Sequence, residues 1–239
     1  MHTNMSYKNT HTSTLFHFTK RQNTLLSILR DGIRISYCSE NITDNISLGV
    51  PMVSFCDIPL MSCAEHRSKY GLYAIGFAKN AFNNIPNGCE IGPIGYFSTG
   101  QKGLIDNLIN LVSSRDQAVG WSKQFQMIRD CKHQINYDEC EWRILAFKDE
   151  EGNSVHWFWN EVDFSKWKAS RTDKFLDDII ITFSASDIRY IIVNQEQNIP
   201  NVVKRILKLK TISGKFASIE DKELLCSRII SFEQLKSDF

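Results

Sequence analysis

Short strand-like segments outnumber helical ones in this 239-residue chain, and the two kinds do not alternate regularly. Apolar or alternating runs predict strands at residues 14–18, 51–55, 72–77, 91–97, 141–147, 155–159, 179–183 and 190–193. Helical spacing of apolar residues predicts helices at residues 20–31, 59–70, 199–210 and 219–229, with a mainly helical insertion at about 101–132. Because helices cluster early, in the middle and late, the order predicts an α+β fold rather than a doubly wound parallel sheet.

Composition limits the class of protein. The 42% apolar content and only 5 prolines indicate a folded chain, and the net charge of +1 gives no global attraction to nucleic acid or membranes. Seven scattered cysteines without a CxxC pair fit a reduced compartment better than a disulfide framework or a zinc site. No run of eighteen apolar residues and no signal core occurs, so we expect a soluble cytoplasmic protein.

The expected organisation is one domain. Residues 1–13 are polar and predict a flexible N-terminal segment, and residues 14–239 predict a single domain that contains the insertion at about 101–132. Residues 38–50 are rich in asparagine and are expected to form a loop.

The segment from Tyr137 to Ile144 carries the densest chemistry in the chain. In a strand, period two places Glu139, Glu141 and Arg143 on one face and Trp142 on the other. Two carboxylates and a guanidinium on a rigid strand can stabilise positive charge on a sugar or orient a ribose hydroxyl. They can equally form a structural ion pair at a strand edge.

Two further segments can reach a ligand. His17 and Thr19 end the first expected strand, where they can bind a phosphate or ribose, or serve only as a core histidine and a helix cap. Cys56 invites a nucleophile interpretation, but a small buried thiol is commoner, and Asp57 is expected to cap the helix that begins at Pro59.

A third group is weaker. His66 and Tyr70 share one helix face, where they can line a pocket or simply pack and face solvent. His133 and His156 lack metal-ligand spacing, and no phosphate-binding loop, dinucleotide-binding glycine motif or kinase signature is present. The basic residues between Lys204 and Lys210 are expected to form the solvated face of a helix.

Several motifs, in order, resemble the AbiGi family of abortive phage resistance. The resemblance runs from about residue 14 to residue 195 and implies a bacterial phage-defence role, with an antitoxin component. The matching segments are residues 15–19, 32–38, 55–60 (FCDIPL), 70–76, 137–143 (YDECEWR) and 187–193.

A more distant resemblance concerns the ADP-ribosyltransferase fold, in its DNA-modifying toxin branch. An HxT at the end of a first strand, followed by LLSILRDG, is similar to the opening of that fold. The resemblance implies a split mixed or antiparallel sheet with flanking helices, NAD as the substrate and no metal. Carried over by motif, His17 and Thr19 match the first motif, Ser54 and Phe55 the middle motif, and Glu141 the late glutamate.

The departure from that pattern lies in the middle motif. There is no STS triplet, and no tyrosine stands at the usual strand position unless Tyr70 or Tyr73 substitutes. Glu139 stands two residues before Glu141, which gives the ExE form of the late motif.

The roles implied by the resemblance are chemically coherent. Glu141 would stabilise the oxocarbenium ion that forms when the nicotinamide–ribose bond breaks, and Glu139 would activate or orient the acceptor. Phe55 or a nearby tyrosine such as Tyr70 would stack on nicotinamide, and His17 would hold the adenosine ribose.

The leading hypothesis is therefore an ADP-ribosyltransferase of phage defence that moves ADP-ribose from NAD to a nucleic acid or protein acceptor. A non-catalytic antitoxin or phage-sensing binding protein on the same fold, with a cognate toxin as its partner, is the alternative. A magnesium nuclease using Asp138, Glu139 and Glu141 is a third hypothesis. No membrane partner is expected.

Overall fold

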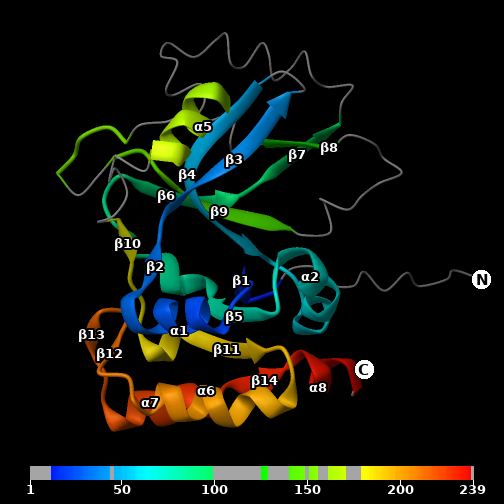
Figure 1. Ribbon diagram of the computed structural model, residues 1–239, viewed down its shortest axis with the longest axis vertical. Coiled ribbons are helices and arrows are strands. Elements are labelled where there is room, and N and C mark those ends of the chain that lie inside the picture. The colour runs from blue at the N-terminus through cyan, green and yellow to red at the C-terminus, as the bar shows by residue number, and fades with distance from the viewer. Residues whose placement is uncertain are drawn as a thin grey trace, which may run out of the picture.

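The computed structural model describes residues 12–43, 46–98, 125–128, 140–148, 151–155, 161–170 and 179–237. These residues build an eight-stranded sheet in the order β14-β11-β5-β1-β4-β9-β6, with β3 paired to β4 beside that path (Figure 1). Neighbouring strands are antiparallel except β11 and β14, which are parallel. The strands are β1 (Thr14–Thr19), β3 (Ser36–Thr43), β4 (Ile46–Cys56), β5 (Tyr73–Ala78), β6 (Cys89–Pro93), β9 (Glu141–Ala146), β11 (Ile188–Val193) and β14 (Ile229–Ser231).

Smaller elements surround this sheet. Three two-stranded sheets join β2 (Ile33–Arg34) to β10 (Ile180–Ile181), β7 (Gly95–Ser98) to β8 (Phe125–Ile128), and β12 (Thr211–Ile212) to β13 (Lys215–Phe216) in the described part of the chain. The helices are α1 (Gln22–Asp31), α2 (Cys63–Tyr70), α5 (Glu161–Ser170), α6 (Ile199–Ile206), α7 (Ile219–Cys226) and α8 (Phe232–Ser237). The predicted α+β class with a mixed sheet is confirmed, whereas the likeness to the ADP-ribosyltransferase fold stays a prediction.

None of the helices among the described residues has the length and apolarity needed to cross a bilayer.

The hydrogen-bonded ladder of the main sheet is shortest between β1 and β4. Strand β1 pairs with β5 at six positions, but its pairing with β4 is given by one register pair, Phe16 with Cys56, in the described ladder. Strand β4 instead runs on beside β3 and β9, so that β3, β4, β6 and β9 gather in the upper half of Figure 1 and β1, β5 and β11 in the lower half. A narrow junction of this kind leaves the two strand groups free to diverge beside it.

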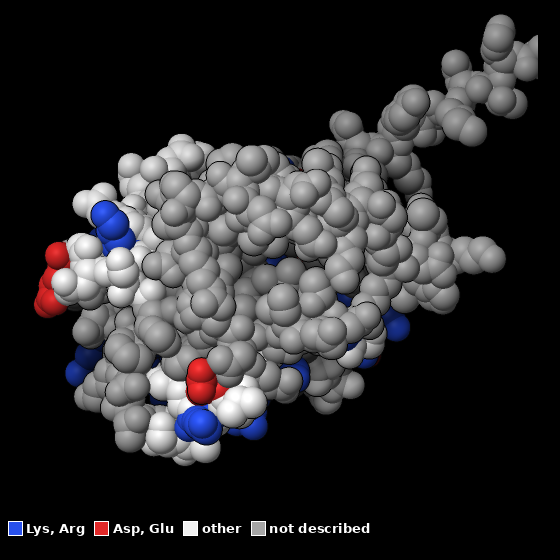
Figure 2. All heavy atoms as spheres, turned by 90° about the horizontal axis from the view of Figure 1, so that it is seen from above, with Lys and Arg blue, Asp and Glu red and all other residues white. Residues whose placement is uncertain are grey.

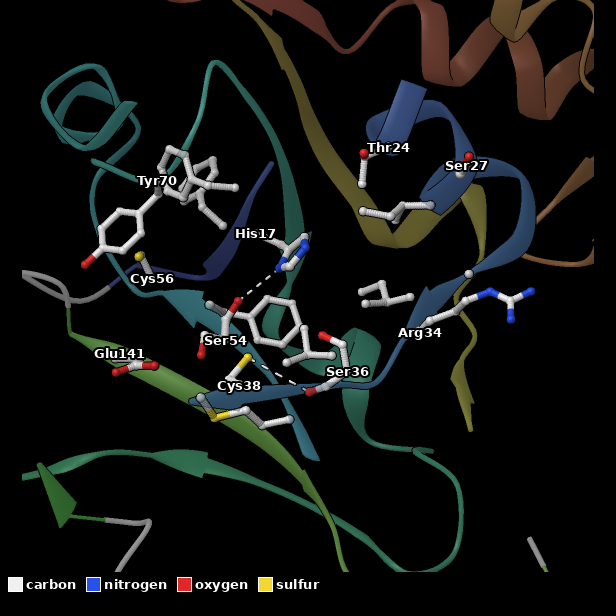
Figure 3. Close-up of a pocket in the computed structure, with 18 of the residues that line it drawn as sticks. His17, Thr24, Ser27, Arg34, Ser36, Cys38, Ser54, Cys56, Tyr70 and Glu141 are labelled. Carbon is white, nitrogen blue, oxygen red and sulfur yellow. Dashed lines mark hydrogen bonds between the residues drawn. The ribbon is translucent and has the colours of Figure 1, made fainter. Parts of the chain in front are cut away.

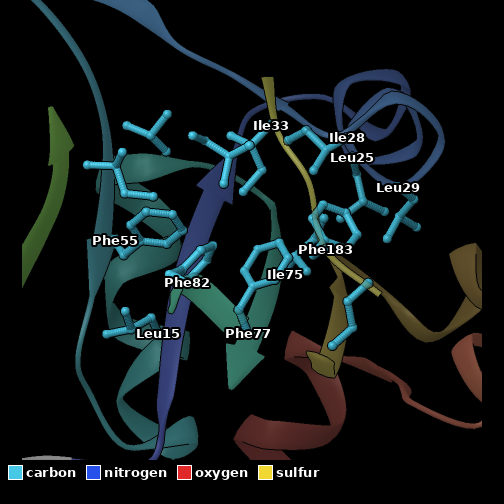
Figure 4. Close-up of a cluster of buried hydrophobic side chains, with 14 of the residues drawn as sticks. Leu15, Leu25, Ile28, Leu29, Ile33, Phe55, Ile75, Phe77, Phe82 and Phe183 are labelled. Atoms are coloured by element: carbon cyan, nitrogen blue, oxygen red, sulfur yellow. The ribbon is translucent and has the colours of Figure 1, made fainter. Parts of the chain in front are cut away.

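Helix α1 forms because its apolar residues recur on one face. Leu25, Leu26, Ile28 and Leu29 are all buried. Figure 4 shows Leu25, Ile28 and Leu29 beside the aromatic cluster that includes Phe183. Burial of such a face, rather than helix propensity, provides most of the stability of a ten-residue helix.

The ends of α1 show one success and one error of the sequence prediction. Gly32 ends the helix as predicted, with φ of 98°, and an added Cβ there would lie 2.6 Å from Cγ2 of Ile180. Thr19, however, does not cap the helix, since α1 begins at Gln22 with Arg21 in the cap position. Thr19 remains in β1, where it pairs with Tyr73.

Other segments differ from their expected structure. Residues 38–50, expected as a loop, lie mostly in β3 and β4, because a long antiparallel ladder overrides the weak strand propensity of asparagine and serine. Residues 125–128, expected within a helical insertion, form β8 parallel to β7. The remainder of the insertion at 101–132 and residues 1–11 lie outside the described residues, and Thr12 is held by hydrogen bonds to Asp57.

Candidate functional site

A cavity of about 400 Å³ lies where β1 and β4 separate. Its walls come from β1, the second half of β4, the face of α1, the residues that follow α1, and the ends of α2 and β9 (Figure 3). This volume is within the range of small-molecule sites. The narrow junction of the sheet therefore creates a pocket of ligand size.

Five of the residues predicted from sequence line this cavity: His17, Ser54, Phe55, Tyr70 and Glu141. They come from four elements and from positions up to 124 apart in the chain, yet they converge. Thr19 is buried at the end of β1 and is not among the lining residues.

Glu139, the second predicted catalytic residue, lies outside the described residues. The structure therefore describes only Glu141 of the two predicted catalytic residues.

His17 has a defined tautomer. Its Nδ1 lies 3.0 Å from the backbone oxygen of Ser54, and since a carbonyl oxygen can only accept, Nδ1 carries the hydrogen and donates. Burial lowers the pKa of His17 below its usual value of 6.5, and the bond to Ser54 offsets part of this. The imidazole is thus neutral at pH 7, and its Nε2 is a hydrogen-bond acceptor.

Glu141 is held by a buried arginine. Nε of Arg143 lies 2.8 Å from Oε1 of Glu141, and Nη2 lies 2.9 Å from Oε2, so the guanidinium binds the carboxylate with two parallel hydrogen bonds. The two side chains are 2% and 8% exposed. The predicted common face of Glu141 and Arg143 is confirmed, and the arginine neutralises the acid. Strand β9 lies between β4 and β6, so this pair is not at a sheet edge.

Phe55 belongs to the core more than to the cavity. It is 1% exposed, and its ring lies 4.9 Å from Phe82 and 6.2 Å from Phe77, centroid to centroid. A ring enclosed in this way lacks the free face that stacking on nicotinamide requires. The prediction also named a nearby tyrosine, Tyr70, which lines the cavity.

Tyr70 provides that alternative aromatic surface. Its ring lies 6.1 Å from Phe18, which also lines the cavity, and 6.2 Å from His66, as expected for two residues on one helix face. In Figure 3, Tyr70 lies with Cys56 and Glu141 on one side of His17.

The other side of His17 carries residues that the sequence analysis missed. Thr24 and Ser27 of α1 lie there in Figure 3, with Arg34 of β2 and Ser36 of β3. Asp31, at the end of α1, also lines the cavity. Spacing of three and four residues places the three α1 residues together, so helical periodicity of polar side chains could have found them. A hydrogen bond from Arg30 lowers the pKa of Asp31, which keeps that carboxyl ionised at the rim.

Asp57 does not cap a helix, so that prediction is wrong. The short 3-10 helix after it (Leu60–Ser62) has Pro59 at its cap position and no side-chain cap. Asp57 is instead fully buried, with its Oδ2 2.6 Å from Nζ of Lys79 and its Oδ1 2.9 Å from the backbone nitrogen of Thr12. A hydrogen bond from the charged amino group of Lys79 is stronger than one from a backbone nitrogen at a helix end, so Asp57 binds the lysine.

The same residue joins the two sequence motifs. The backbone nitrogen of Asp57 donates to the oxygen of Cys140 at 3.1 Å, and Nζ of Lys79 lies 5.2 Å from the ring centre of Trp142. The FCDIPL segment thereby fixes the start of β9, and with it the position of Glu141.

A metal site finds no support among the residues that the structure describes, where no group of three His, Cys, Asp or Glu residues could hold an ion. Of the three acids in the nuclease hypothesis, Asp138 and Glu139 lie outside those residues. Cys56 is buried, in keeping with the structural interpretation of this thiol.

Comparison with known proteins gives two matches. Residues 32–134 match the family model described as "Putative abortive phage resistance protein AbiGi, antitoxin". The chain is also 24% identical, over 231 residues, to the abortive phage resistance protein AbiGi of Lactococcus lactis subsp. cremoris, covering 80% of this chain and 89% of that protein. No solved structure gives a significant match. The resemblance to the AbiGi proteins of abortive phage resistance, first seen in the motifs, is therefore confirmed.

Proposed function

We propose that this chain acts in abortive phage resistance as a binding protein of the antitoxin type, and that its cavity holds a nucleotide-type ligand without breaking it. The observation that carries the proposal is the ion pair of Glu141 with Arg143. The family description, which names an antitoxin, supports it.

The chemical reason lies in the charge of the pair. Cleavage of the bond between nicotinamide and ribose builds positive charge on the sugar, and a glutamate stabilises that charge through its own negative potential. At Glu141 a guanidinium binds both oxygens in a buried setting, so the net charge of the pair is zero. A neutral pair of this kind stabilises an oxocarbenium ion poorly.

The ion pair of Glu141 with Arg143 impairs the binding of a ligand less than it impairs catalysis. The neutral His17 offers an acceptor at Nε2, and Ser54 and Glu141 contribute oxygen atoms to the same cavity. These groups suit the hydroxyl donors of a ribose, while Tyr70 and Phe18 offer rings to a flat base. NAD is the ligand that the resemblance to ADP-ribosyltransferases favours.

The test has a biochemical arm and a cellular arm. Calorimetric titration of the purified chain with NAD should show binding that His17→Ala weakens, while chromatography detects no release of nicotinamide. In cells, expression of the chain should relieve the toxicity of the protein encoded beside it. Toxicity of the chain itself, removed by Glu141→Gln, would contradict the proposal.

The second candidate function is ADP-ribosyl transfer, and a specific observation favours it. His17, Ser54, Phe55, Tyr70 and Glu141 were named from the resemblance to that superfamily, and all five line one cavity. On this hypothesis Arg143 swings away when NAD binds and leaves Glu141 against the ribose. Release of nicotinamide by the wild type, abolished in Glu141→Gln at unchanged NAD affinity, together with ADP-ribose attached to an acceptor, would establish the transferase.

A further inference from the structure

A second cavity, of about 280 Å³, lies between α1 and the end of α6. Two arginines and two other polar residues line it over two leucines: Arg30, Arg205, Asn23, Ser27, Leu26 and Leu209. Ser27 also lines the first cavity, but neither arginine does. The two cavities therefore share one wall residue and are otherwise separate.

Arg205 is held at this cavity by α1. Its Nη1 donates to Oδ1 of Asn23 at 2.8 Å, and beside it Nε2 of Gln22 donates to Oδ1 of Asn201 at 3.0 Å. These two hydrogen bonds join α1 to α6. Because the partner of Arg205 is an amide and not a carboxylate, this contact positions the guanidinium without neutralising its charge.

The surroundings of the second cavity are positively charged. Arg30 is bound by Asp31 through Nε and Nη2, yet 53% of its side chain is exposed. Lys204 and Lys208 are exposed one turn apart, on α6 and just after it. Figure 2 looks onto the other end of the molecule, where acidic and basic side chains of the described residues occur together. The positive charge of the cavity is therefore local.

The acidic residues of α7 do not cancel this charge. Helix α7 packs against α6 and carries Glu220, Asp221 and Glu223. Asp221 accepts a hydrogen bond from the backbone nitrogen of Ser218 at 3.2 Å and so caps its own helix. Within the part of the chain that the structure describes, no ion pair joins these carboxylates to α6. The cations of α6 therefore remain available to an external anion.

We propose that the second cavity binds a phosphate group of a nucleic-acid backbone. Arginine, asparagine and serine side chains are the usual donors to backbone phosphates, and a guanidinium binds two phosphate oxygens at once. Lys204 and Lys208 extend the positive charge beyond the cavity, which suits the repeated phosphates of a strand better than one free anion. The core of a protein interface would instead offer aromatic anchors, and the lining of this cavity contains none.

The experiment measures the affinity of the purified chain for a labelled oligonucleotide, single-stranded or duplex, by fluorescence anisotropy at about 0.1 M salt. Arg205→Ala should weaken binding about tenfold, because charge-assisted hydrogen bonds to the phosphate are lost. The slope of log affinity against log salt should fall by about 0.7 to 0.9, the value for one phosphate contact.

A second variant keeps the arginine and removes only its free charge. Asn23→Asp places a carboxylate where Oδ1 of Asn23 now accepts from Arg205, so the guanidinium gains an internal ion pair. Binding of the oligonucleotide should weaken at least as much as in Arg205→Ala. The helix should persist, because an acidic residue suits the first turn of a helix.

Lys166→Ala is the matched control. It also removes one positive charge, but Lys166 is 75% exposed on α5, which lies in the other half of the molecule from α1 and α6 (Figure 1). The affinity should change by less than about twofold, because distant surface charges are screened at this salt concentration. Equal losses in Lys166→Ala and Arg205→Ala would mean that binding follows net charge alone, which would overturn the inference.

Other outcomes decide between ligands. Binding of inorganic phosphate without binding of either oligonucleotide would assign the cavity to a free anion and overturn the inference. Binding of a glutamate-rich peptide in place of the oligonucleotides would overturn it as well. The heat of NAD binding should be the same in Arg205→Ala as in the wild type, because Arg205 does not line the first cavity. A wild type that binds the oligonucleotide through Arg205 but does not bind NAD would support this inference and overturn the proposed function alone.

Discussion

Two buried carboxylates, Asp57 and Glu141, lie side by side in this protein and are held in different ways. They are close because Cys56, next to Asp57, pairs with Glu141 across β4 and β9. Asp57 binds Lys79, whose side chain is 29% exposed, and also both donors of Thr12. Glu141 binds Arg143, which is 2% exposed, through both of its oxygens.

The two pairs differ in their relation to the cavity. Asp57 does not line the cavity and connects three segments of the chain, so its role is to position the end of β4 and the start of β9. Glu141 lines the cavity, and its charge is cancelled by a partner that has no access to water. Two neighbouring acids thus have different surroundings, because a partly exposed lysine binds one and a buried arginine binds the other.

The largest effect is expected from removal of the buried arginine. Arg143→Gln should lower the free energy of unfolding by about 3–5 kcal/mol, because it removes the guanidinium that binds both oxygens of the buried carboxylate of Glu141. Urea denaturation followed by circular dichroism measures this. The double variant Glu141→Gln with Arg143→Gln should recover part of the loss, and a double variant less stable than the single one would contradict this account of the pair.

A smaller loss is expected for the other pair. Asp57→Asn should cost about 2 kcal/mol, because the hydrogen bonds to a charged group weaken while Lys79, with 29% of its side chain exposed, remains solvated. The same denaturation series tests it. A loss as large as that of Arg143→Gln would show that the two pairs do not differ as described.

The neutral His17 predicts that the free energy of unfolding depends on pH. Its pKa is lowered in the folded state, so the unfolded chain binds more protons below the ordinary value of 6.5. Stability from this residue is complete above that pH and falls as the pH drops toward the folded pKa. The free energy of unfolding should therefore fall more between pH 7.5 and pH 5.5 in the wild type than in His17→Asn, and parallel pH profiles would refute the lowered pKa of this imidazole.

The smallest effect is expected outside both pairs. Phe216→Ser should change the free energy of unfolding by less than about 0.5 kcal/mol, because the side chain is 86% exposed. Thermal unfolding of this variant gives the reference stability for the variants Arg143→Gln and Asp57→Asn. A loss above 1 kcal/mol would mean that Phe216 supports the fold.

Much of the site could be predicted from sequence because it depends on local pattern. Period two in residues 139–144 placed Glu141 with Arg143, and the HxT at the end of β1 placed His17 at the cavity. What failed depends on distant partners. Asp57 was predicted as a cap because its contact with Lys79, 22 residues away, is not visible in the local sequence. Residues 38–50 were predicted as a loop because the pairing of β3 with β4 overrides their local preference. Thr24 and Ser27 line the cavity from α1, but the helix was predicted from its apolar face, and its polar face was not assigned a role.

We propose that the cavity binds a nucleotide while Arg143 keeps Glu141 from assisting bond cleavage. The most direct measurement follows nicotinamide release by the wild type at an NAD concentration that calorimetry shows to be saturating. We expect the wild type to give heat of binding with NAD and to release no more nicotinamide than buffer alone. Steady release by the wild type, lost on Glu141→Gln, would contradict it.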